Sequence, residues 1–214
     1  MPEKDFENTS TVEEYKWNQE AVLELTDVMS DPAYRTEEKL RTALEIVADR
    51  SDFPVVYLTH IDEGIQQLLL VENSVGLDGI EEGRTDPLSD TYCRYTVSGD
   101  SELTVLEVGR NLPRDDPAYR NFGFEYYVGA PVQVEGNVYG TVCLADTETR
   151  GSKLPGPVKA LVRVLSMWLG YEIERMEQER HTAVLERVLR HNLRNSLIAY
   201  CMFGNSSRLG RHCG

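Results

Sequence analysis

The sequence is short of lysine and of long apolar runs, and each shortage excludes a class of protein. No apolar run approaches the ~20 residues that a helix needs to span a bilayer, so we expect no membrane span. The polar residues 1–5 do not resemble a signal peptide, which predicts a cytoplasmic protein. Only 5 of the 22 basic residues are lysine, and the net charge is −14. Because such a surface repels phosphate backbones, nucleic acid is not an expected partner.

The same composition indicates a protein from a high-salt cytoplasm, where arginine replaces lysine and carboxylates are in excess. The Debye length falls to ~3 Å at 1 M salt, so repulsion among the 36 acidic side chains costs little there. An ordinary acidic protein is the alternative, which the shortage of lysine disfavours. Hydrophobic residues make up 41% of the 214, enough for one full domain with extensions or for two small domains.

Cysteine and histidine are also scarce. The four cysteines show no framework spacing, which predicts free thiols in a reducing compartment. Together with the scattered histidines they show no metal-ligand spacing, so no metal site is expected, and no particular cofactor is indicated. The residues concerned are Cys93, Cys143, Cys201, Cys213, His60, His181 and His212.

Hydrophobic periodicity predicts helices first, then a mixture of strands and short helices. The predicted helices cover residues 12–29 and 36–50, with shorter ones over 88–97 and after Asp116. The neighbouring Asp115 and Asp116 are interpreted as a solvated loop pair. Apolar and β-branched runs predict a buried hairpin that turns at Gly136-Asn137. The predicted strands are 53–61, 65–72, 103–108, 127–134 and 138–144.

Five segments of the chain resemble a GAF sensor domain over residues 36–150, and the last of them is the most specific. The resemblance implies an α+β fold, a six-stranded antiparallel sheet with helices on its faces. It divides the chain into an N-terminal helical extension (1–35), the GAF domain, a signalling helix (155–199) and a tail (200–214). The five segments are Asp90–Thr96, Leu103–Val108, Asp116–Tyr119, Tyr127–Val132 and Gly140–Asp146.

From Pro157 to about Ala199 the pattern is helical, with apolar residues in a loose heptad register and Glu and Arg between them. A helix of roughly 40 residues extends ~60 Å. A globule of this size needs no such rod, whereas a coiled coil does, so a homodimer through this helix is expected. The alternative is a helix whose first half folds back on the sheet and whose second half frays.

Residues 189–197 resemble the phosphoacceptor box of two-component histidine kinases, in a His-Asn-Leu-Arg-Asn form like that of haloarchaeal sensor kinases. The resemblance makes His191 the phosphoacceptor and Asn195 its helper. Neutral imidazole is a nucleophile near pH 7, and the i+4 spacing places both residues on one helix face. Asn192 stands where many such kinases have an acid. The alternative is a solvated histidine on a charged helix.

Only 17 residues, 198–214, follow Leu197, too few for a second bundle helix and an ATP-binding domain. The chain also has no GxxxxGK phosphate loop. It therefore resembles a histidine kinase that ends just past its acceptor histidine. We therefore expect no autonomous kinase activity. The expected partner is a kinase catalytic domain or a response regulator that acts in trans.

The GAF resemblance also indicates candidate ligand-binding residues: Cys93, Tyr95, Phe122 and Tyr127. Some GAF proteins attach a bilin to a pocket cysteine, others bind cyclic nucleotides, and a few are redox enzymes. The alternative is that these side chains, like Cys143, are ordinary core residues. The function predicted is a signal-transduction sensor. A dimeric ligand-binding module without phosphotransfer is the second hypothesis. A thiol redox enzyme using Cys93 is the third, disfavoured by the long helix and by a lack of paired reactive cysteines.

Overall fold

The computed structural model describes residues 19–99, 101–151 and 154–204, with side chains described up to residue 182 and at Arg187. Residues 1–18, the first half of the predicted N-terminal extension, and residues 205–214 of the predicted tail lie outside this part. The chain divides into two compact units between Glu172 and Ile173. The first unit contains the sheet and extends beyond the predicted domain end at residue 150, because it includes the first part of the C-terminal helix.

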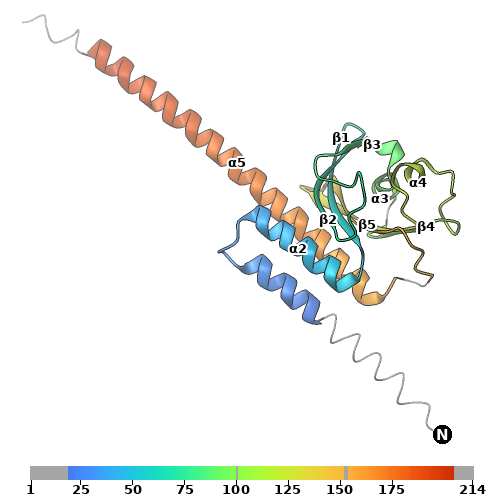
Figure 1. Ribbon diagram of the computed structural model, residues 1–214. Helices are drawn as coiled ribbons and strands as arrows, with labels where there is room; N and C mark the ends of the chain where they lie inside the picture. The colour runs from blue at the N-terminus through green and yellow to red at the C-terminus, as the bar shows by residue number, and fades with distance from the viewer. Residues whose placement is uncertain (1–18, 100, 152–153, 205–214) are drawn as a thin grey trace, which may run out of the picture. The chain divides into compact units, whose positions relative to one another are not determined.

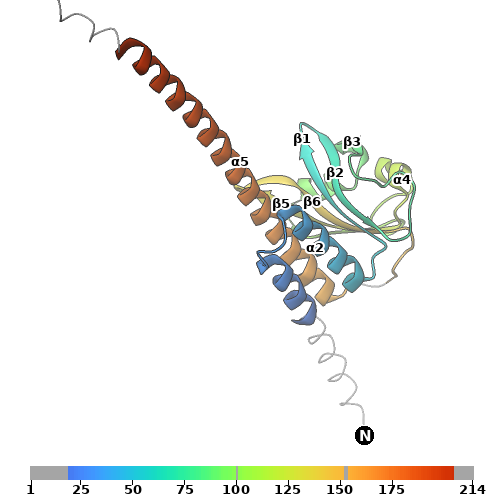
Figure 2. The same cartoon turned by 60° about the vertical axis from the view of Figure 1, so that its left-hand side comes forward.

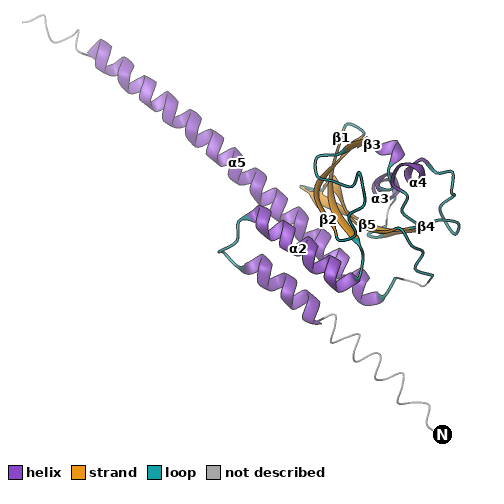
Figure 3. Cartoon of the chain, viewed as in Figure 1, coloured by secondary structure: helices purple, strands orange, loops and turns teal. Residues whose placement is uncertain are grey.

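The described strands form one curled antiparallel sheet of six strands, in the order β3-β2-β1-β6-β5-β4 (Figures 1 and 3). The coarse prediction, an α+β protein with such a sheet and a C-terminal helix, is confirmed. The strands are β1 (Val55–Asp62), β2 (Ile65–Asn73), β3 (Thr85–Pro87), β4 (Thr104–Glu107), β5 (Tyr126–Val134) and β6 (Asn137–Asp146).

Helices lie on both faces of the sheet: α2 and the first part of α5 cover one face, and α3 and α4 lie on the other (Figures 1 and 2). Residues 19–30 are also helical. The remaining helices are α2 (Thr36–Ser51), the 3-10 turn η1 (Leu88–Asp90), α3 (Cys93–Ser98), α4 (Pro117–Phe122) and α5 (Gly156–Gly204).

Most predicted elements are found within two residues of their expected bounds, and three details differ. The predicted helix over 88–97 is divided into η1 and α3. Strand β3 lies in a segment predicted as loop, because three residues are too few to show alternation. The hairpin turn lies one residue earlier than predicted, since Glu135 and Gly136 have φ of 50° and 79° and Asn137 begins β6. A two-residue turn of this kind needs positive φ at both central residues.

The first part of α5 packs onto the sheet. This agrees with the alternative expectation, in which the first half of the helix folds back on the sheet. Its residues Leu161, Leu165 and Leu169, four apart, are fully buried. At Gly170 a Cβ atom would lie 2.3 Å from the carbonyl oxygen of Gln133 on β5, a distance that no side chain can tolerate. Glycine at this position therefore allows the helix to contact the strand backbone.

Candidate functional site

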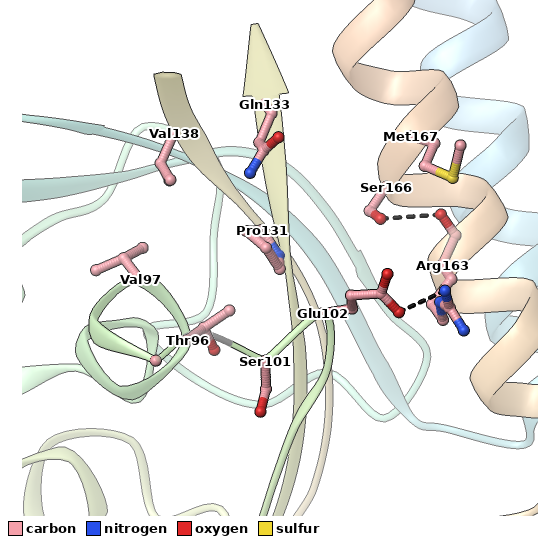
Figure 4. Close-up of a pocket in the computed structure, with 11 residues that line it drawn as sticks. Thr96, Val97, Ser101, Glu102, Pro131, Gln133, Val138, Arg163, Ser166 and Met167 are labelled. Carbon is pink, nitrogen blue, oxygen red and sulfur yellow. Dashed lines mark hydrogen bonds and ion pairs between the residues drawn. The ribbon is translucent and has the colours of Figure 1, made fainter. Parts of the chain in front are cut away.

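A cavity of about 400 Å³ opens beside the β5–β6 hairpin, a volume within the range of small-molecule sites (Figure 4). Three segments far apart in the sequence form its walls. These are α3 and the connection that follows it, the hairpin, and one face of α5. The lining residues are Thr96, Val97, Gly99, Ser101, Glu102, Pro131, Gln133, Val138, Arg163, Ser166 and Met167.

An ion pair between Arg163 of α5 and Glu102 borders this cavity (Figure 4). Both side chains are more than half exposed, so the pair adds only about 0–1 kcal/mol to stability. Neither charge is tightly held, and either can turn toward a ligand. Ser166 Oγ, by contrast, donates to the carbonyl oxygen of Arg163 at 2.9 Å. The cavity therefore offers a ligand one cation, one anion and the apolar side chains of its lining.

None of the predicted ligand-binding residues lines this cavity. Cys93 and Tyr127 are fully buried between α3 and the sheet. Tyr127 is joined to the cavity wall by one hydrogen bond, because its hydroxyl is 2.9 Å from Oγ1 of Thr96, which lines the cavity. Tyr95 and Phe122 are partly buried against the same core. The residues that do line the cavity were not found from the sequence, since they come from three separate segments and form no motif.

Aromatic side chains fill the interior where a pocket was expected. Tyr92 stacks on Tyr127 with ring centroids 5.0 Å apart, and Phe122 stacks on Phe124 at 5.8 Å. Burial raises the pKa of Tyr92 well above its ordinary value, and its hydroxyl donates to the carbonyl oxygen of Phe124 at 2.6 Å. These rings pack against one another and form part of the hydrophobic core.

Two thiols meet in this core. Cys93 Sγ of α3 lies 3.6 Å from Cys143 Sγ of β6. Thr141 Oγ1 lies 3.0 Å from Cys93 Sγ, and Tyr127 Oη lies 3.2 Å from Cys143 Sγ. The expected burial of Cys143 is confirmed. The fold brings these two cysteines into contact, although their separation in the sequence shows no spacing pattern.

The two thiols differ in acidity. Burial by itself would raise the pKa of Cys93, but hydrogen bonds from Cys143, Thr141 and Tyr127 offset it, and the pKa is lowered. Burial raises the pKa of Cys143 well above its ordinary value, and the neighbouring Cys93 adds to that increase. Of the two thiols, Cys93 is therefore the one that loses its proton more easily.

Asp116 holds α3 and α4 together. Its carboxylate accepts from Arg94 Nη2 at 2.6 Å and from the Tyr95 hydroxyl at 2.5 Å. It also caps α4 by accepting from the backbone N–H of Ala118 at 2.8 Å. The interpretation of Asp115 and Asp116 as a solvated pair is wrong for Asp116, which is buried, whereas Asp115 is exposed. Capping and ion pairing explain why this carboxylate is inside.

His191 and Asn195 both lie within α5, whose backbone is helical at both positions. Their side chains lie outside the described part of the structure. The helical backbone places residues four apart on the same face, as the interpretation of the acceptor box requires.

No family model matches the chain, and no curated protein matches it significantly in sequence. Within residues 19–99, 101–151 and 154–204, no helix is both long and apolar enough to cross a membrane. In that same part of the chain, no three His, Cys, Asp or Glu side chains are grouped to hold a metal ion.

Proposed function

We propose that the chain is a signal-transduction sensor in which a GAF-type domain, residues 36–150, controls a phosphoacceptor histidine, His191. One observation supports this most directly. The helix that forms a wall of the cavity through Arg163, Ser166 and Met167 is the same helix that contains His191. A small molecule bound in the cavity contacts α5 directly, and α5 is the element that presents the acceptor.

Coupling between the two sites requires that a ligand prefer one arrangement of α5 over another. The Arg163–Glu102 pair provides such a preference, because a ligand with a charged group competes for one partner and releases the other. Because Gly170 of α5 packs closely against the backbone of Gln133 in β5, a movement of the helix would displace the strand. Helix shifts of 1–2 Å are a common form of switching in signalling proteins.

In the phosphotransfer step, the neutral imidazole of His191 attacks the γ-phosphorus of ATP, the bond to the β,γ-bridging oxygen breaks, and ADP leaves. Such a step requires a protein that holds the nucleotide in line with the acceptor. We assign that role to a separate kinase catalytic domain acting in trans, and assign to Asn195 the positioning of the attacking group. A response regulator is the proposed recipient of the phosphoryl group.

Trans-phosphorylation tests this proposal. The chain is mixed with labelled ATP, with and without the catalytic domain of a histidine kinase that has the same form of acceptor box. We expect acid-labile labelling only in the mixture, and its loss in His191→Gln. His181→Gln is the matched control, since His181 is an exposed histidine on the same helix. Labelling that persists in His191→Gln, or labelling without the catalytic domain, contradicts the proposal.

A second candidate is a dimeric ligand-binding module without phosphotransfer, and an apolar surface on α5 favours dimerisation. Met167 and Tyr171 are 75% and 64% exposed, and they border a hollow together with Met29 and Trp168. Exposed apolar side chains grouped in this way mark contact surfaces. We propose that a second copy of the chain covers them.

Light scattering tests the dimer. Met167→Glu with Tyr171→Glu is expected to shift the mass from dimer toward monomer, because it places like charges across the contact. Val75→Glu is the control, since Val75 is 57% exposed, lies in the loop after β2 and borders neither the hollow nor the cavity. An unchanged mass in the double variant, or a monomeric wild type, contradicts the dimer. If the dimer persists while His191 is never labelled, the module without phosphotransfer becomes the better account.

A further inference from the structure

The Cys93–Cys143 pair has no part in the proposed phosphotransfer, yet the fold places its two sulfurs in direct contact. The two sulfurs are 3.6 Å apart, whereas a disulfide is about 2.05 Å long. Both cysteines are free and fully buried. One comes from a six-residue helix, α3, and the other from β6, which lies between β1 and β5 in the sheet. A disulfide between them would draw α3 closer to β6.

The surroundings of the sulfurs are polar for the interior of a protein. Thr141 Oγ1 donates to Cys93 Sγ, and Tyr127 Oη donates to the same sulfur at 3.7 Å. Thr59 Oγ1 extends the network, 2.8 Å from Thr141 Oγ1. Donors aimed at sulfur favour its thiolate, which is the reactive form of cysteine. The hydroxyl network therefore surrounds the two sulfurs with groups that can stabilise a thiolate.

The network also reaches the cavity. Thr96, in the cavity wall, contacts Tyr127 Oη, which contacts both sulfurs. Gly129 makes room for this contact, since a Cβ there would lie 2.2 Å from Tyr127 Oη and 2.3 Å from Thr96 Oγ1. A helix as short as α3 is not stable by itself, and local opening of such a segment costs less than global unfolding. Local opening of α3 would expose the two buried sulfurs to a small oxidant.

We propose that Cys93 and Cys143 form a dithiol that hydroperoxides oxidise to a disulfide. The Cys93 thiolate attacks one oxygen of the peroxide, the O–O bond breaks, and a sulfenic acid and water are formed after one proton is taken up. The Cys143 sulfur then attacks the sulfenic sulfur, the S–O bond breaks, and a second water leaves with the Cys143 proton. In total the two thiols lose two electrons and two protons, and one hydrogen peroxide becomes two waters.

The disulfide ties α3 to a central strand and so fixes part of the cavity wall. Thr96 and Val97 lie on α3, one turn after Cys93, and both line the cavity. Oxidation therefore alters the same cavity that is proposed to receive the ligand. The inference goes beyond phosphotransfer and does not depend on it, because it concerns only the domain that contains the sheet.

The test uses the full chain with Cys201→Ser and Cys213→Ser, so that only these two thiols remain. After treatment with hydrogen peroxide the protein is alkylated in denaturant and its mass is measured. We expect a mass lower by two hydrogen atoms, no alkyl groups, a cross-linked Cys93–Cys143 peptide, and full reversal by dithiothreitol. Two alkyl groups per chain, sulfinic acids, or a disulfide between chains would each overturn the proposal.

Two further variants in the same background separate the roles of the two thiols. Cys143→Ser is expected to stop at the Cys93 sulfenic acid, which dimedone traps, while Cys93→Ser leaves Cys143 unreacted. Circular dichroism checks that both variants fold, since serine fits the hydroxyl network. Equal reaction of both single variants, or of neither, contradicts the assigned order of attack.

Hydrogen exchange provides a readout that a merely packed cysteine pair would not change. Amides of residues 93–98 are expected to exchange more slowly in the oxidised protein than in the reduced one, with no such difference in Cys143→Ser. Unchanged exchange would show that the disulfide does not restrain α3. His191→Gln is expected to oxidise like the parent, so failure of phosphotransfer and failure of this inference are distinguishable.

Discussion

Toward α2 and α5, the middle of strands β1 and β6 presents aliphatic side chains, whereas toward α3 the same stretch presents hydroxyl groups and a thiol. The alternation of a strand places Val56, Leu58, Val142 and Leu144 on the first face, and Tyr57, Thr59, Thr141 and Cys143 on the second. All eight side chains are buried. The two faces therefore differ in chemistry and share the same degree of burial.

The difference separates a stabilising layer from a reactive one. An aliphatic layer needs only volume and close packing. A buried polar layer must satisfy each hydrogen bond, at a cost of about 1–3 kcal/mol for each group left unpaired. Because the α3 side retains its polar groups in spite of this risk, we assign stability mainly to the α2–α5 side and chemistry to the α3 side.

The largest effect is expected on the aliphatic side. Leu165→Ala removes a fully buried side chain of α5 and leaves a cavity, which lowers the free energy of unfolding by about 2–5 kcal/mol. Urea unfolding measures the change. Lys159→Ala is the control, since Lys159 is exposed on the same helix and should change the value by less than about 0.5 kcal/mol. Equal effects of the two substitutions would contradict the packing of α5 on the sheet.

Acid is expected to weaken the α3 side through Asp116. Burial opposes ionisation of Asp116, but the Tyr95 hydroxyl, Arg94 and the Ala118 N–H hold its pKa below the ordinary value. Its stabilising contribution is therefore present above the ordinary pKa of about 3.9 and is lost as pH falls through the lower pKa of the folded state.

Asp116→Asn tests that assignment. The variant is expected to unfold about 1–3 kcal/mol more easily at pH 7, because Arg94 loses its partner. Its stability should also fall less steeply than that of the wild type below about pH 4. Asp115→Asn, at the neighbouring exposed position, is the control. Parallel pH curves for Asp116→Asn and the wild type would contradict the buried ion pair.

The smallest effect on stability, but a specific one, is expected at Thr141. Thr141→Val removes the hydroxyl that donates to Cys93 and pairs with Thr59, at a cost of about 1 kcal/mol. Loss of the donor raises the pKa of Cys93, so the pH at which this thiol reacts with iodoacetamide shifts upward. An unchanged pH profile would show that Thr141 does not tune the thiol.

Much of the fold followed from local patterns in the sequence. Strands β1, β2, β5 and β6 are long enough to show alternation or a continuous apolar run, and helix α2 shows an apolar stripe. Strand β3 has three residues and includes Pro87, too little for a periodic signal. The burial of Asp116 could not be predicted, because its partners Arg94 and Tyr95 lie more than 20 residues earlier in the chain.

The candidate site was harder to predict than the fold. His191 and Asn195 belong to one contiguous segment, so a resemblance could indicate them. The cavity joins Glu102, Gln133 and Arg163, which no spacing rule connects. The thiol pair joins residues of α3 and β6, and only the packing of a helix on the sheet reveals their contact. Sequence patterns report local structure, and these two sites depend on tertiary contacts.

The central claim, that the cavity controls His191 through α5, is tested most directly by the rate at which His191 is labelled in trans. Arg163→Gln breaks the ion pair at the cavity without touching the acceptor box. We predict a change in the labelling rate on the order of fivefold, which corresponds to a coupling of about 1 kcal/mol. Arg120→Gln, at an exposed arginine of α4 that does not line the cavity, should leave the rate unchanged. Equal rates for Arg163→Gln and the wild type, with His191 still labelled, would contradict control by the cavity.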